Sequence, residues 1–171
     1  MDARKESEPT PGKSREMERK SDREMVFARA VNGPARIVFE AWTKPELLKR
    51  WWVPKSIGVS LVSCEADART GGKYRFVFRH PSSEQPMAFF GRYIEVTPHS
   101  RIVWTNEESE EGAVSTATFE EKGGKTLVVI RDLYASKDAL DAAIASGSAG
   151  GMGDEMFDQL DELLVTLGVG V

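Results

Sequence analysis

The fold is decided by residues 34–78, which read PARIVFEAWTKPELLKRWWVPKSIGVSLVSCEADARTGGKYRFVF. Apolar residues recur at helical spacing after Pro34 and again after Pro45. A proline suits the start of a helix, because the N–H groups of the first turn have no partner inside the helix. The second segment ends in Trp51 and Trp52. We therefore expect two short amphipathic helices that present aromatic side chains to the interior, followed by a strand.

Strand patterns surround this helix pair. Tyr74, Phe76 and Phe78 alternate with mostly charged residues, so they share one face of a strand. Further runs rich in β-branched and aromatic residues recur at hairpin spacing, separated by turn-forming clusters. We predict strands at residues 25–31, 59–67, 72–79, 87–96, 101–107, 113–121 and 125–134.

The pattern becomes helical again after Tyr134. Ser136 is suited to cap the start of a helix. The glycine-rich run at residues 146–151 predicts a break that acts as a hinge. From Met152 the helix resumes, with apolar residues on one face and acidic residues on the other. The apolar face holds Met152, Met156, Phe157, Leu160, Leu163, Leu164 and Leu167, and the acidic face holds Asp154, Glu155, Asp158, Asp161 and Glu162.

These elements predict an α+β fold with an uncommon order of parts. A curved antiparallel sheet of about seven strands wraps around a long C-terminal helix. Two short helices lie between the first and second strands. Before them, residues 1–24 contain seven basic, seven acidic and three apolar side chains, Met1, Ala3 and Met17. Such a segment buries too little surface to offset its ordering entropy. We predict a disordered tail at 1–22, with a transient helix at 14–23, and one folded domain at 23–171.

Composition narrows the class of protein. The chain has 171 residues, of which 40% are hydrophobic, and a net charge of −4. The charge argues against a nucleic-acid partner, which would favour a broad basic surface. Cys64 is the single cysteine, so it forms no disulfide within the chain and fits a reducing, cytoplasmic compartment. We interpret Cys64 as a small buried hydrophobe. No segment has the length or apolarity of a membrane span.

No catalytic or metal-binding motif stands out. The Gly123-Gly124-Lys125-Thr126 run lacks the earlier glycine and the following helix of a phosphate loop, and reads as a hairpin turn. His80 and His99 lie in predicted turns without metal-ligand spacing. We therefore predict no metal and no cofactor, and favour a function other than catalysis.

The aromatic residues allow two interpretations. They can simply fill the core, or they can also line a cavity between sheet and C-terminal helix that suits an apolar or amphipathic small molecule. The candidate ligand-binding residues are Trp51, Trp52, Tyr74, Phe76, Phe78, Tyr93, Trp104, Met152, Met156 and Leu160.

Several segments in order resemble a known family. They are FEAWT at residues 39–43, GGKYRF at 71–76, GRYIEV at 91–96, RIVWT at 101–105 and LDELL at 160–164. The chain resembles the activator of heat-shock protein 90 ATPase homologue family, in the START-like (SRPBCC) helix-grip superfamily. The resemblance covers about residues 24–167 and implies the same helix-grip fold. The superfamily includes lipid carriers, hormone receptors and polyketide cyclases.

The resemblance implies three classes of function. The first is a protein that binds a lipid-like or aromatic molecule in the cavity between the sheet and the C-terminal helix, as a monomer or homodimer. The second is a co-chaperone-like module that contacts a heat-shock protein 90 homologue in a stress response. Only the C-terminal half of that co-chaperone is matched, so we expect weak or no chaperone stimulation. The third is a cyclase or hydratase that uses Tyr93, Glu95 or Arg75. An all-apolar lining would favour binding, and a buried ionisable pair would favour catalysis.

Overall fold

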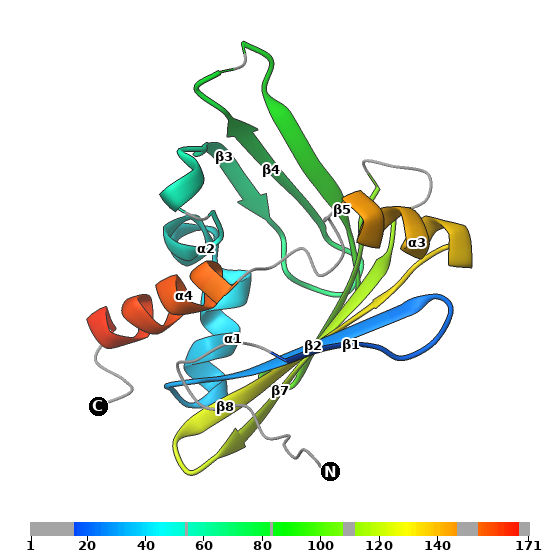
Figure 1. Ribbon diagram of the computed structural model, residues 1–171. Coiled ribbons are helices and arrows are strands. Elements are labelled where there is room, and N and C mark those ends of the chain that lie inside the picture. The colour runs from blue at the N-terminus through cyan, green and yellow to red at the C-terminus, as the bar shows by residue number, and fades with distance from the viewer. Residues whose placement is uncertain (1–15, 54, 83, 108–111, 147–153, 168–171) are drawn as a thin grey trace.

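A curved sheet of eight antiparallel strands forms the body of the protein (Figure 1). The computed structural model describes residues 16–53, 55–82, 84–107, 112–146 and 154–167. In this part of the chain the strand order is β1-β2-β8-β7-β6-β5-β4-β3. The strands are β1 Glu16–Arg19, β2 Glu24–Val31, β3 Ser60–Ala66, β4 Lys73–Arg79, β5 Met87–Thr97, β6 Arg101–Thr105, β7 Val114–Lys122 and β8 Lys125–Leu133.

The described residues also form four α-helices and one short 3-10 turn. They are α1 Ala35–Thr43, α2 Pro45–Trp51, the short 3-10 turn η1 Lys55–Ile57, α3 Lys137–Ser146 and α4 Asp154–Thr166. Figure 1 shows α1, α2 and α4 gathered together, with α3 set apart from them. Helix α1 packs on β7 and β8, α4 packs on β2, and α2 contacts both α1 and α4. The predicted helix-grip fold is confirmed, with both short helices between β2 and β3.

The strands bury alternate residues, as a pleated sheet with one covered face requires. In β4 the buried residues are Tyr74, Phe76 and Phe78, as predicted. In β2 the same alternation places Arg29 inward, between Phe27 and Val31. The inner face is therefore apolar with one buried guanidinium, which needs a partner of opposite charge.

Helix α4 supplies that partner. The Arg29 Nη2 atom lies 2.7 Å from Asp158 Oδ1 and 3.2 Å from Asp161 Oδ2. The second oxygen of Asp161 accepts the backbone N–H of Asn32 at 2.9 Å. Asp161 is therefore not on a solvated face, which corrects the expectation for the acidic side of this helix. Its side chain is only 16% exposed, because it reaches over the edge of α4 to β2.

A second contact joins α4 to the end of α2. The Gln159 side chain is buried and donates to the carbonyl oxygens of Trp51 at 3.0 Å and Val53 at 2.8 Å. Its own carbonyl oxygen accepts the backbone N–H of Lys55 at 2.9 Å. These bonds satisfy carbonyl groups that the last turn of a helix leaves without an intrahelical partner. Helix α4 is thus tied to both the sheet and the helix pair.

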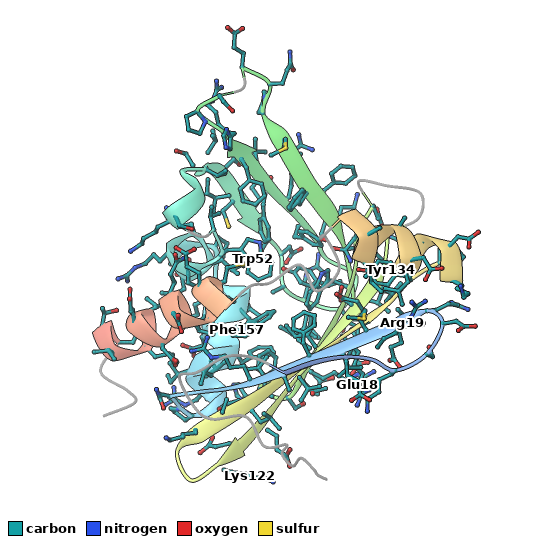
Figure 2. The ribbon with its side chains drawn as sticks, viewed as in Figure 1. Glu18, Arg19, Trp52, Lys122, Tyr134 and Phe157 are labelled. Atoms are coloured by element: carbon teal, nitrogen blue, oxygen red, sulfur yellow. The ribbon has the colours of Figure 1, made fainter. Side chains whose placement is uncertain are left out.

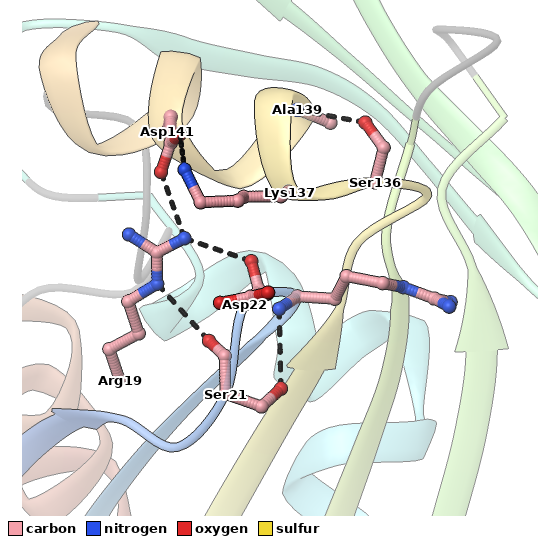
Figure 3. A network of polar contacts seen from close by, with 8 residues as sticks. Arg19, Ser21, Asp22, Ser136, Lys137, Ala139 and Asp141 are labelled. Carbon is pink, nitrogen blue, oxygen red and sulfur yellow. Dashed lines mark hydrogen bonds and ion pairs between the residues drawn. The ribbon is translucent and has the colours of Figure 1, made fainter.

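The sheet has one strand more than the approximately seven that were expected. Strand β1 comes from residues 16–19, inside the predicted disordered tail, and it pairs with β2 rather than forming a transient helix. Arg19 then reaches α3, where its Nη2 lies 2.8 Å from Asp141 Oδ1 (Figure 3). Lys137 holds the same carboxylate at 2.9 Å, and Ser136 caps the helix by accepting the N–H of Ala139, as predicted. The domain boundary at residue 23 stays a prediction.

Two deletions test the role of this strand. Removing residues 1–15 should leave the melting temperature unchanged, because the charge pattern of that segment gives it little surface to bury. Removing residues 1–20 also removes the backbone bonds of β1 to β2 and should lower Tm by about 2–4 °C, the change expected for about 1 kcal/mol. Differential scanning calorimetry measures both, and equal Tm values for the two deletions would show that β1 contributes nothing.

Candidate functional site

A small cavity lies between the helix pair and strands β4 to β6, not between the sheet and the C-terminal helix as predicted, since no described residue of α4 lines it. Its volume is about 60 Å³, enough for a few water molecules. Helix α1 and the end of α2 form one wall, and the inner face of the strands forms the other. Figure 2 shows Trp52 at the end of α2, and its ring lies 5.8 Å from that of Phe76 on β4. The lining residues are Trp42, Leu48, Trp52, Tyr74, Phe76, Phe89, Tyr93, Ile102, Trp104 and Asn106.

Local sequence explains how these side chains converge. Phe89 and Tyr93 lie an even number of residues apart on β5, so both point inward. Gly91, between them, is also on the inner face, and a Cβ atom there would collide with the carbonyl oxygen of Thr105. A glycine is therefore required where β5 and β6 approach each other. The same Thr105 carbonyl accepts the Tyr74 hydroxyl at 2.7 Å, which fixes this ring against the cavity wall.

The lining is aromatic and, in the described part of the chain, holds no charged side chain. Burial raises the pKa of the Tyr93 phenol well above its usual range, and the nearby Cys64 and Asp67 raise it further. Tyr93 therefore stays protonated at neutral pH and is a poor general base. The polar side-chain groups among the lining residues are those of Tyr74, Tyr93 and Asn106 and the indole N–H groups of the tryptophans.

One of these polar groups has no protein partner. Trp42 is only 4% exposed, and its Nε1–H finds no acceptor among the residues that the structure describes. The neighbouring Trp51 differs, because its Nε1–H donates to the carbonyl oxygen of Ala41 at 2.9 Å. Most buried polar groups in native proteins are paired, so an exception at a cavity wall is significant.

A buried polar chain runs away from the cavity at Asn106. The Asn106 Nδ2 donates to the Ala113 carbonyl oxygen at 2.5 Å and to Ser115 Oγ at 3.1 Å. The Ser115 hydroxyl donates in turn to Asp132 Oδ1 at 2.7 Å. Asp132 is buried on the inner face of β8, and burial raises its pKa, although the bond from Ser115 offsets part of this effect.

The predicted site residues separate into three groups. Trp52, Tyr74, Phe76, Tyr93 and Trp104 line the cavity. A second group is buried in the core but does not line it, and Met152, like residues 147–151 of the predicted glycine-rich break, lies outside the described residues. The second group is Trp51, Phe78, Met156 and Leu160.

Five of the lining residues were not among the predicted site residues. Trp42 and Leu48 belong to the apolar faces of the predicted helices, which gave a signal for burial but not for a cavity. Phe89 and Ile102 lie in predicted strands. Asn106 follows β6 and carried no signal, because its role depends on contacts with Ala113 and Ser115.

The three residues considered for catalysis are not brought together. Tyr93 lines the cavity, whereas Arg75 lies on the other face of β4, with its guanidinium 5.9 Å from the Phe90 ring centroid. The register of β5 shifts between Tyr93 and Glu95, and the Glu95 carboxylate pairs with Arg101 at 3.2 Å near the surface. The structure assembles no catalytic group from these three.

The described residues offer neither a reactive cysteine nor a metal-binding cluster. Cys64 is half-buried, and burial raises its pKa to about 11, so its thiol stays protonated and weakly nucleophilic. Within residues 16–167, the described parts hold no cluster of three metal-ligating side chains. The described helices also include none long and apolar enough to cross a membrane.

The family follows from a comparison with known sequences. Residues 32–165 match the model of the family described as Activator of Hsp90 ATPase homolog 1-like protein. The chain belongs to this family. The match includes α1, α2, strands β3 to β8, and every residue that lines the cavity. No curated protein matches the chain.

Solved structures of the same fold come from several bacteria. A protein from Rhodobacter sphaeroides is 23% identical, with a TM-score of 0.80 over 90% of this chain and 99% of that one. One from Staphylococcus epidermidis is 26% identical, with a TM-score of 0.73 over 88% and 94%. An AHSA1-like protein from Aeromonas hydrophila is 17% identical, with a TM-score of 0.64 over 84% and 94%. These likenesses show the fold.

The buried carboxyl of Asp132 predicts a distinctive pH dependence. Its folded pKa is raised, so the folded state binds a proton more readily than the unfolded state does. The wild type therefore loses stability as pH rises from about 4 through the raised pKa. Asp132→Asn cannot ionise and avoids this loss. The stability of the variant relative to wild type should increase between pH 3.5 and pH 7, as measured by denaturant unfolding at each pH.

Glu107→Gln is a control of opposite sign. Bonds from Arg92 and Thr105 lower the Glu107 pKa, so its contribution to stability is present at neutral pH and is lost as pH falls through the lowered pKa. This variant should lose stability relative to wild type between pH 3.5 and pH 7. A pH-independent difference for Asp132→Asn would contradict a carboxyl whose pKa is raised by burial.

Proposed function

We propose that the protein binds a small apolar or aromatic molecule in the cavity between the helix pair and strands β4 to β6. The observation that carries the proposal is a wall of aromatic side chains without a charged one in the described part of the chain. Ligand sites in proteins are concave, mostly apolar, and carry few polar groups. A cytoplasmic location remains part of this proposal and is supported by the single cysteine.

The size of the cavity defines how a guest would enter. Ligand pockets usually measure about 300–1,000 Å³, so a larger guest needs more room than the 60 Å³ present. Strand β5 offers that room at the mouth, where Phe89 is 44% exposed and Met87 is 49% exposed. These two side chains share one face of the strand and extend the apolar surface outward. We infer that a guest enters past Phe89, whose ring turns outward and then packs against the bound guest.

Binding is better supported than catalysis. The ionisable side chains that line the cavity are Tyr74 and Tyr93, and the pKa of Tyr93 is raised by burial. A phenol that stays protonated can donate a hydrogen bond but does not abstract a proton at neutral pH. The buried Asp132 is linked to the cavity through Ser115 and Asn106.

A second candidate is a protein-interaction module for a chaperone, which the name of the family supports. A groove of about 400 Å³ on the outer face of β4 and β5 is lined by Lys73, Arg75 and Arg92, and also by Glu65 and Glu107, so basic side chains outnumber acidic ones. Such a surface suits an acidic partner segment. The test is ATP turnover of the host's heat-shock protein 90 homologue. We expect almost no change, and a dose-dependent rise that Arg75→Glu abolishes would favour this candidate instead.

Fluorescence titration tests the proposed cavity. The neutral dye N-phenyl-1-naphthylamine should bind with roughly micromolar affinity, worth about 8 kcal/mol, and brighten as it leaves water. Phe89→Ala should weaken binding about tenfold, because an aromatic contact contributes about 1 kcal/mol beyond its buried area. Fatty acids and flavonoids should displace the dye if they share the site.

Phe90→Ala is the matched control for this titration. Phe90 is the next residue of β5 and faces the outer side of the sheet, where Arg75 covers it. Its replacement removes the same ring without touching the cavity, so dye affinity should stay at the wild-type value. Equal loss in both variants, or no dye binding by the folded wild type, would overturn the proposed function.

A further inference from the structure

We propose that the cavity recognises a neutral aromatic guest with a hydrogen-bond acceptor for Trp42 Nε1–H and a donor for Asn106 Oδ1. The inference rests on the proposed function and adds the chemical class of the guest. A hydroxylated or amino-substituted aromatic carbonyl compound carries both groups. Each half of the inference follows from a different set of contacts.

The acceptor on the guest is inferred from Trp42. The ring of Trp42 is held by Trp51 at 5.2 Å, Trp52 at 5.6 Å and Phe119 at 5.6 Å between ring centroids. The indole therefore cannot turn freely to find another partner, and its N–H has no acceptor in the described residues. An acceptor on a guest in the cavity that Trp42 lines would satisfy it.

The donor on the guest is inferred from Asn106. A backbone carbonyl oxygen only accepts hydrogen bonds, so the atom 2.5 Å from the Ala113 oxygen must be the Asn106 amide nitrogen. This fixes the side-chain amide, with Oδ1 directed to the opposite side. The Tyr74 hydroxyl lies 3.5 Å from Oδ1 but donates to Thr105 at 2.7 Å. Oδ1 therefore retains capacity to accept from a guest.

Asp132 acts as a positioning residue behind this amide. Because the Ser115 hydroxyl donates to Asp132, the lone pairs of Ser115 Oγ are left to accept from Asn106 Nδ2. Asp132, Ser115 and Ala113 thus impose one orientation on Asn106. This arrangement explains why a carboxyl is placed on the inner face of β8, where an apolar residue would pack more easily.

The guest is expected to be neutral. The lining in the described part of the chain has no charged side chain that could pair with an ionised guest. A buried charge without a partner is strongly unfavourable. Carboxylate forms of the same aromatic compounds should therefore bind more weakly than their neutral ketone or aldehyde counterparts.

Calorimetric titration with four probes of similar shape tests both hydrogen bonds. Ethylbenzene has neither group, acetophenone has the acceptor, 4-ethylphenol has the donor, and 4-hydroxyacetophenone has both. We expect acetophenone to bind about tenfold more tightly than ethylbenzene, equivalent to about 1.4 kcal/mol, with a similar gain for 4-ethylphenol. The probe with both groups should bind most tightly.

Two tryptophan variants assign the acceptor contact. Trp42→Phe keeps an aromatic ring but removes the N–H, so acetophenone and ethylbenzene should then bind equally. Trp104→Phe makes the same change at another lining residue and should weaken all four probes together, retaining the acetophenone preference. Asn106→Leu should likewise remove the preference for 4-ethylphenol over ethylbenzene. If this variant does not fold, the comparison of 4-ethylphenol with ethylbenzene on the wild-type protein still tests whether a donor on the guest strengthens binding.

The outcomes distinguish this inference from the proposed function. Equal binding of all four probes to wild type would leave an apolar binding site and overturn the hydrogen-bond pair. An acetophenone preference that survives Trp42→Phe would overturn the role of Trp42. Absence of binding by all four probes and by the dye would overturn both proposals.

Discussion

The packing of Trp42 is the interaction on which the rest of the structure depends. This side chain of α1 contacts Trp51, the last residue of α2, and Trp52, which follows it, and also Trp104 and Phe119 from the sheet. It therefore sets the angle between the two short helices and their distance from the strands at once. Since α1 and α2 form one wall of the cavity, the same contacts define its shape. Large aromatic contacts of this kind contribute more than their buried area alone.

Polar contacts complete the arrangement at both ends of the inner face. At one end Arg29 joins β2 to Asp158 and Asp161 of α4. At the other end Asp132 and Ser115 hold Asn106 at the cavity. Buried polar groups of this kind contribute little net stability but specify one arrangement over its alternatives, which we take to be their role here. The cavity lies where the apolar packing between these ends is incomplete.

Much of the fold could be predicted because local patterns and tertiary structure agree. In β4 the alternating aromatic residues can all be buried only if that face of the strand turns inward, and the same holds for the apolar faces of α1 and α2. The structure buries each of these faces. Strand β1 was missed because charged residues at 16–19 join the sheet through backbone bonds, which composition does not reveal. Asp161 was misplaced because its partner, Arg29, lies far away in sequence. The inward position of Arg29 was nevertheless visible in the alternation of β2.

The candidate site was less predictable than the fold. Aromatic residues in α2 and β4 to β6 indicated an apolar interior, but they did not distinguish filled core from cavity wall. Trp51 and Phe78 are core, whereas Trp52 and Phe76 line the cavity, and the two pairs have the same chemical character. Asn106 has a role only because Ala113 and Ser115 lie beside it in space. Such information arises from the tertiary packing.

The most direct test is the ¹⁵N–¹H spectrum of the tryptophan indole groups. The chain has four tryptophans, so four resonances report on the interior, and Trp42→Phe assigns the relevant one. Addition of acetophenone should move the Trp42 indole proton downfield, as a new hydrogen bond requires, and ethylbenzene should not. If acetophenone moves the Trp52 and Trp104 signals but leaves the Trp42 proton in place, the guest binds without this hydrogen bond, and the central claim is wrong.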